Sequence, residues 1–205
     1  SKRFVTLSDF DAAVSASLAD AGRLCKAGRA YLFQLRDNGT IIDNTHEWFD
    51  EGVTPEKQNL QNLPSTMFPW WMAKLNANDV IHITDVSMLP AEASAEKDIL
   101  EKQGIKSLLA IPVYAEKTLM GFIGFDNVKT TGSWSANDTA MLHIVAEIMG
   151  NALCRKQAED LIKNMAYHDA LTQLPNRNLF QNNLQMAMAH TRRNKTVVAI
   201  MILDI

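Results

Sequence analysis

The feature of the sequence that most constrains the fold is a run of helix-forming residues from Ser135 to about Tyr167. Ser135 is a suitable N-cap, and Asp138 follows three residues later, at the position of a capping-box acid. A helix over this range has more than thirty residues and would be about 45 Å long at 1.5 Å per residue. One small domain cannot bury a helix of that length, so part of it must extend beyond the domain that precedes it.

Apolar residues along this helix recur at alternating spacings of four and three, which places them on one face. They are Met141, Val145, Ile148 and Ala152, followed one residue out of phase by Cys154, Ala158, Leu161 and Met165. Such a seam is typical of a parallel two-stranded connector, so we expect a homodimer through the Ser135–Tyr167 helix. The phase shift leaves a second interpretation open, in which the helix packs on its own domain and frays beyond Arg155.

Composition and charge argue against several classes of function. The 205 residues carry a formal net charge of -3 at pH 7, so the chain lacks the basic footprint of a nucleic-acid-binding protein. It has no run of eighteen apolar residues, and we therefore expect no membrane segment within it. Cys25 and Cys154 are far apart and form no CxxC motif or Cys/His cluster, which makes a reducing cytoplasm the expected location.

The residues before the long helix predict a mixture of helices and strands. The expected order is a helix ending at Gly28, a β-hairpin over 31–49, a loop over 50–64, a helix over 67–75, a strand over 78–86, a helix over 91–103 and two strands over 107–114 and 118–128. Alternating residues around Asp37-Asn38-Gly39 indicate the hairpin. This order predicts an α+β domain with a central antiparallel sheet flanked by helices.

Two local features of this region bear on function. Gly121 and Gly124, inside the last predicted strand, indicate the close approach of another backbone, a side chain or a ligand. Glu92 and Glu96 stand near the start of the amphipathic helix over 91–103, where acids favour the positive end of a helix. We expect the charges of that helix to form a solvated face.

The run from Gly104 to Val113, the run from Gly121 to Asn127 and Trp134 before the long helix resemble the C-terminal half of a GAF domain. The resemblance covers about Phe10 to Arg155 and implies a GAF sensory domain over 1–155, with a GAF-like (PAS/profilin-like) sheet. The helix over 135–168 would then run from this domain into a linker. GAF domains are sensory modules whose ligands range from cyclic nucleotides to tetrapyrroles and small metabolites. The resemblance thus implies a regulatory role and an unknown small-molecule ligand.

By analogy with GAF domains, a pocket would lie between one face of the sheet and the helices over it. The candidate lining residues are Trp48, Trp71, His82, Phe125 and Asp126. Each has an alternative role in packing or at the surface, and His82, between apolar neighbours on a strand, would then be a structural histidine. The residues that mark cyclic-nucleotide-binding GAF domains are not evident. No cysteine lies between Asp85 and Ser107, the region through which phytochrome-like GAF domains attach a bilin.

A second resemblance covers residues 169–205. The tract Asp169–Arg177 and the apolar run Val197–Ile205 resemble the opening of a GGDEF domain, the α/β catalytic domain of diguanylate cyclases. That domain joins two GTP molecules into cyclic di-GMP. Gln173 stands where the family usually has glycine. Asp204 matches the Mg²⁺-binding aspartate of the family, and the carbonyl of Ile205 matches the backbone ligand beside it.

The second segment would be a truncated N-terminal part of a GGDEF domain. It lacks the GG(D/E)EF loop, the guanine contacts and the second metal carboxylate, so we expect this chain to have no catalytic residues, no cofactor and no activity on GTP. The resemblance implies a parent diguanylate cyclase that uses GTP and Mg²⁺. Two alternatives stay open. The GAF domain could be a ligand-free dimerisation and spacer unit, or the parent could join a degenerate GGDEF domain to a cyclic di-GMP phosphodiesterase domain.

Overall fold

The computed structural model describes residues 10–169, 171–172 and 174–201. The contacts within the chain divide it into two compact units, Ser1–Cys154 and Arg155–Ile205, and each is described by itself. Of the helices in the described ranges, none is both long enough and apolar enough to cross a membrane.

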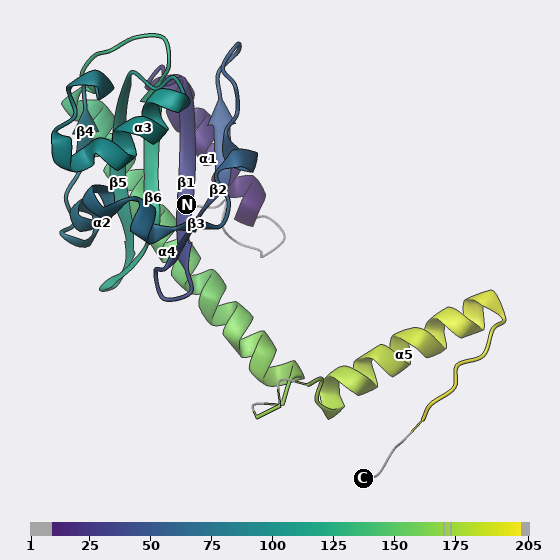
Figure 1. Ribbon diagram of the computed structural model, residues 1–205. Helices are drawn as coiled ribbons and strands as arrows, with labels where there is room; N and C mark the ends of the chain where they lie inside the picture. Colours follow the sequence, from purple (N-terminus) through teal and green to yellow (C-terminus); the bar gives the residue numbers. More distant parts are fainter. Residues whose placement is uncertain (1–9, 170, 173, 202–205) are drawn as a thin grey trace. The chain divides into compact units, whose positions relative to one another are not determined.

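A six-stranded antiparallel sheet forms the centre of the first unit (Figure 1). Its strands lie in the order β3 (Leu63–Pro64), β2 (Ile41–Phe49), β1 (Arg29–Arg36), β6 (Thr118–Asn127), β5 (Ser107–Ala115) and β4 (Ile81–Ile83). The two predicted hairpins, β1–β2 and β5–β6, are joined side by side through β1 and β6. The prediction of an α+β domain with a central antiparallel sheet is confirmed.

Helices cover both faces of this sheet. Helix α1 (Phe10–Leu24) and the first part of α4 (Ala136–Tyr167) pack on one face, and α2 (Pro69–Asn76) and α3 (Ser94–Lys102) lie on the other (Figure 1). Each face has its own hydrophobic cluster of buried side chains. The unit is therefore a three-layer arrangement with the sheet between two sets of helices.

Helix α4 begins with the capping box expected from the sequence. The Ser135 hydroxyl accepts a hydrogen bond from the backbone N–H of Asp138 at 3.2 Å, and the Asp138 carboxylate accepts one from the N–H of Ser135 at 2.8 Å. These two bonds satisfy donors that a helix start leaves without partners. The helix that follows has 32 residues, as the sequence predicted.

Within the first unit, most of the apolar seam predicted along α4 faces the core of its own domain. Ala152 is buried, and Met141 and Val145 pack against the core of their own domain. These side chains cover the sheet, so they are not free to meet a second copy. The exposed apolar residues of this part of α4 include Ile144, 59% exposed, and Ile148, 43% exposed. Of the first four predicted seam residues, only Ile148 is exposed.

The second unit contains the end of α4, a turn and helix α5 (Arg177–Asn194). The Asp169 carboxylate accepts hydrogen bonds from the backbone N–H of Thr172 at 2.9 Å and of Leu171 at 3.2 Å, which lowers the pKa of Asp169. Asn176 caps α5 through its side chain. Of the described residues of α5, none is buried.

Two expectations about strands need correction. The predicted loop over 50–64 contains the short edge strand β3, in which Pro64 pairs with Ile41; proline is tolerated at an edge because a missing N–H is not needed there. The strand expected over 197–205 is not formed in its described part, since residues 197–201 pair with no other described strand and a lone strand is not stable. Asp204 and Ile205, the expected Mg²⁺ ligands, lie outside the described residues.

Candidate ligand-binding site

A cavity lies between the sheet and helices α2 and α3 in the first unit. It leaves about 60 Å³ in which the centre of a water-sized group can move. Aromatic side chains from β1, β6 and the α2 region form much of its wall: Tyr31, Phe33, Phe68, Trp71 and Phe122. Six charged or amide side chains also line it: Arg29, Asn44, Glu47, Glu96, Gln103 and Asp126. The cavity thus combines an apolar wall with an unusual number of polar groups.

Strand alternation brings residues of β1 and β6 to this face. Arg29 is paired in register with Asp126, and Phe33 with Phe122. Residues two apart on a strand point to the same side of the sheet. The Phe33 and Phe122 rings stack, with their centroids 4.7 Å apart and an angle of 9° between their planes. A charged pair and an aromatic pair therefore form the floor of the cavity.

An irregularity in β2 supplies two more polar residues. The register between β1 and β2 shifts beside Thr45, so that Asn44 pairs with Phe33 and Glu47 pairs with Tyr31. A regular strand would send residues three apart to opposite faces, but one extra residue in a β-bulge reverses the alternation. The bulge is the reason that Asn44 and Glu47 both line the cavity.

The Arg29–Asp126 ion pair is buried, and each residue is 1% exposed. The Arg29 Nε lies 3.0 Å from one carboxylate oxygen of Asp126 and 3.1 Å from the other. Burial raises the pKa of Asp126 to about 6, although the positive charge of Arg29 acts in the opposite direction. Removal from water therefore outweighs the attraction between the two charges.

Glu96 joins the two helices over the cavity. It stands on α3, is 1% exposed, and accepts a hydrogen bond through Oε1 from the backbone N–H of Trp71, at 3.1 Å. That N–H is in the first turn of α2, where the helix itself offers no acceptor. One carboxylate oxygen of Glu96 thus helps to hold α2 against α3. The expectation of a solvated face was wrong for this residue.

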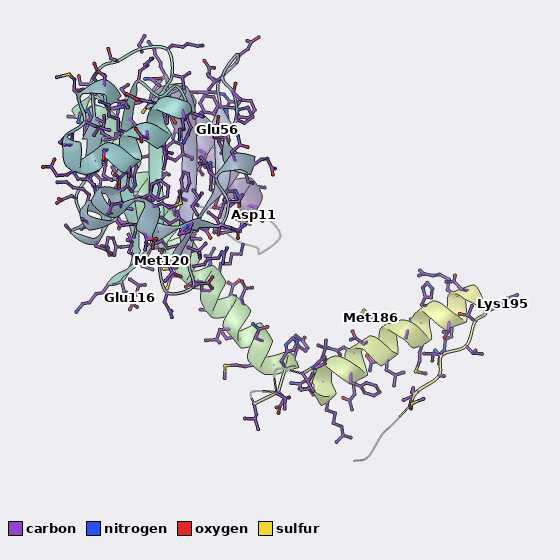
Figure 2. The ribbon with its side chains drawn as sticks, viewed as in Figure 1. Asp11, Glu56, Glu116, Met120, Met186 and Lys195 are labelled. Carbon is purple, nitrogen blue, oxygen red and sulfur yellow. The ribbon has the colours of Figure 1, made fainter. Side chains whose placement is uncertain are left out.

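Glu47 is held by backbone groups. Its carboxylate accepts hydrogen bonds from the N–H of Glu56, at 2.9 Å to the nearer oxygen, and from the N–H of Lys57 at 2.9 Å. Glu56 is labelled in Figure 2, in the segment that follows β2. Burial raises the pKa of Glu47, while these two hydrogen bonds and the charge of Arg29 act to lower it.

Several buried polar atoms of this site have no hydrogen-bond partner among the described residues. They are Arg29 Nη2, Asn44 Nδ2 and Oδ1, Trp71 Nε1 and Glu96 Oε2. All four side chains line the one cavity. Folded proteins satisfy most buried polar groups, and an unmet one costs about 1–3 kcal/mol. The clustering of five such atoms around one cavity indicates a site prepared for a polar molecule.

Of the five candidate pocket residues, Trp71 and Asp126 line this cavity. Phe125 precedes Asp126 on β6 and points to the other face, where its ring centroid lies 5.6 Å from that of Trp134. Trp48 occupies the space beside Gly22 of α1, on the same far face. These two aromatic residues belong to the packing beneath α1 and α4, not to the cavity.

His82 also lies away from the cavity. It is exposed, and its Nε2 accepts a hydrogen bond from the backbone N–H of Trp134 at 3.2 Å. Its neighbours Ile81 and Ile83 are buried in the cluster beneath α2 and α3, so strand alternation turns His82 to the opposite side. Among the described residues, no group of three or more His, Cys, Asp or Glu side chains is arranged to hold a metal ion.

The cavity residues that were not predicted from the sequence include Arg29, Asn44 and Glu96. A signal existed for two of them. Arg29 lies two residues before Tyr31 and four before Phe33, so all three point to the same side of one strand. Glu96 lies four residues before Leu100, on the same face of one helix. Only the bulge in β2 places Asn44 and Glu47 on one face together, and no sequence pattern indicates that bulge.

Comparisons with known families match two parts of the chain. The model of the GAF domain family matches residues 9–153, and that of the diguanylate cyclase GGDEF domain matches residues 166–205. The methanogenesis regulatory histidine kinase FilI of Methanothrix harundinacea (strain 6Ac) is 30% identical over 160 residues. This match covers 76% of the chain but only 18% of the kinase, so the chain spans less than a fifth of that relative.

Two solved structures show a similar fold. The GAF3 domain of Slr1393 from Synechocystis sp. PCC6803, in its photoproduct state, has a TM-score of 0.63 at 18% identity, over 77% of this chain and 99% of that one. The chromophore-binding domain of the bacteriophytochrome RpBphP3 from R. palustris has a TM-score of 0.62 at 17% identity, over 77% of this chain and 59% of that one. At these identities the likeness concerns the fold alone.

Proposed function

The chain belongs to the GAF domain family over residues 9–153, and on that premise we propose that its first unit is a sensor for a small molecule. The ligand would occupy the cavity between the sheet and helices α2 and α3. The observation that supports this proposal is the set of buried polar atoms without partners on Arg29, Asn44, Trp71 and Glu96. A domain that served only as a spacer would gain stability from apolar side chains at these positions.

Helix α4 is the proposed output element of the sensor. Its first part packs on the sheet, and it continues past the end of the first unit at Cys154. We expect two copies of the chain to associate through this helix, with Ile144 and Ile148 among the contacts. A ligand that binds one arrangement of this dimer more tightly would shift the population toward it.

The output is proposed to be cyclic di-GMP synthesis in the parent protein. The match of residues 166–205 to the GGDEF family supports this assignment. A cyclase that joins two GTP molecules held by two subunits requires such a dimer. In the intact domain, Asp204 and the carbonyl of Ile205 would bind Mg²⁺, and the parent would act in the cytoplasm.

The test of the sensor is native mass spectrometry of the purified chain, followed by release and identification of any retained molecule. We expect a dimer with additional mass that denaturation removes. The variant Asn44→Leu replaces two unpartnered amide atoms by carbons of similar volume, so it should keep the fold and lose the additional mass. A wild-type chain that retains no molecule and is not stabilised by any metabolite extract would favour the spacer alternative.

A further inference from the structure

The charges around the cavity are not balanced by the protein. Arg29 forms an ion pair with Asp126. The Glu47 carboxylate accepts hydrogen bonds from two backbone N–H groups. Glu96, which is 1% exposed, pairs with no cation among the described residues. Its Oε1 accepts a hydrogen bond from the N–H of Trp71, and its Oε2 has no partner within them. A buried carboxylate in this state is unfavourable unless a positive group joins it. A cationic donor at Glu96 Oε2 would supply both the missing hydrogen bond and the opposite charge.

The other unpartnered atoms define the rest of the ligand. Arg29 Nη2 and Trp71 Nε1 are donors, and they need an oxygen acceptor. The Asn44 side chain offers one donor and one acceptor, so it suits either end of a polar molecule. The aromatic wall can contact the carbon part of the ligand and attract a positive group through its ring faces.

We propose that the ligand is a small molecule with a protonated amine, bound at Glu96, and an oxygen acceptor, bound at Arg29. This inference rests on the proposed sensor function. The centre of a water-sized group can move in only about 60 Å³ of the cavity. The ligand is accordingly small, and small amino acids or amino alcohols have the required chemistry.

The test uses the refolded 205-residue chain and matched sets of probes in calorimetric titrations. Glycine, alanine, valine and threonine are each compared with the acid that lacks the amine and the amine that lacks the carboxylate; ethanolamine represents the amino alcohols. We expect binding of one or more probes with both groups. The acids without the amine should bind about 30-fold more weakly or not at all, as expected for loss of a buried charge partner.

A pair of variants tests the role of Glu96. Glu96→Gln keeps an oxygen acceptor for the Trp71 N–H but removes the negative charge, so it should weaken binding of the amine-containing probe about 30-fold. Glu101→Gln changes an exposed acid of the same helix and should leave the affinity unchanged. If Glu96→Gln does not fold, the comparison of probes on the wild-type chain still decides the question.

The outcomes separate this inference from the sensor proposal. A probe or a retained molecule that occupies the cavity without an amine, or an affinity that Glu96→Gln leaves unchanged, would overturn the inference and leave the sensor intact. A retained molecule with an amine would support the inference even if no member of the probe set binds. A chain that binds no probe, retains no molecule and is not stabilised by any metabolite extract would overturn both.

Discussion

Asp126 shows how a single residue can make the stability of this domain depend on pH. Its carboxylate and the Arg29 guanidinium pair across neighbouring strands while both are 1% exposed. Burial raises the pKa of Asp126 from an ordinary 3.8 to about 6. The folded protein thus holds a proton on this group at pH values where the unfolded chain has released it.

The sign of the effect follows from that difference. Because the folded state binds this proton more tightly, Asp126 contributes a stabilising free energy that is fully present below about pH 4. That contribution is lost as the pH rises through about 6. We predict that the free energy of unfolding of the wild type, relative to Asp126→Asn, falls by about 2 kcal/mol between pH 4 and pH 7. Urea unfolding of both proteins at several pH values measures this. A difference that is flat or rises with pH would contradict it.

The single residues of the site could be only partly foreseen. Trp71 and Asp126 were named as candidates because the resemblance to GAF domains places a pocket between one sheet face and the helices over it. Glu96 was missed because a charged residue in an amphipathic helix usually lies on its solvated side. Asn44 and Glu47 line the cavity together only because of the bulge beside Thr45. The bulge shifts the alternation of side chains by one residue and leaves no clear mark in the sequence.

At the scale of elements, the capping box, the two hairpins and the length of α4 were predictable because local chemistry determines them. Which face of α4 packs on the sheet could not be predicted in the same way. Val145 and Ala152 fit an intermolecular seam as well as an intramolecular one, because both surfaces demand the same apolar spacing. Only the packing of α4 on the sheet distinguishes the two, and it leaves Ile144 and Ile148 exposed.

The exposed isoleucines give the dimer proposal a direct test. We predict that Ile148→Glu weakens self-association at least about 10-fold, since it would bring two like charges into an apolar contact. His143→Glu is the matched control: it adds the same residue at an exposed position of α4, about 140° away around the helix. Light scattering over a range of concentrations measures both. A monomeric wild type, or equal weakening by the two variants, would show that this face is not the dimer contact.

At the scale of the whole molecule, the two faces of the sheet in the first unit differ in how they are packed. The face beneath α1 and α4 is a continuous apolar cluster, while the face beneath α2 and α3 contains the polar cavity. The cavity and helix α4 therefore lie on opposite sides of one sheet. The central strands β1, β5 and β6 contact both sides through alternate residues, so they could carry an effect of the proposed ligand to α4.

The two units also differ in how much of their structure is protected from water. Strands β5 and β6 are almost wholly buried, whereas the described residues of α5 include none that is buried. Met186 of α5 is 65% exposed, and Figure 2 shows the side chains of this helix standing out around it. Most helices in proteins are stabilised by packing of one face, and an isolated helix of this length is marginal in water.

This contrast predicts a large difference in hydrogen exchange along the chain. The amide hydrogens of β5 and β6 should exchange only when the first unit unfolds, while those of α5 should exchange through local fraying of the helix. For a domain of ordinary stability, about 5 kcal/mol or more, exchange in the strands would be at least about 10³-fold slower than in α5. Exchange measured by mass spectrometry on peptides from both regions checks this. Protection of α5 equal to that of β5 would mean that another surface covers the helix in solution, and a loss of that protection on dilution would identify a second copy of the chain as the cover.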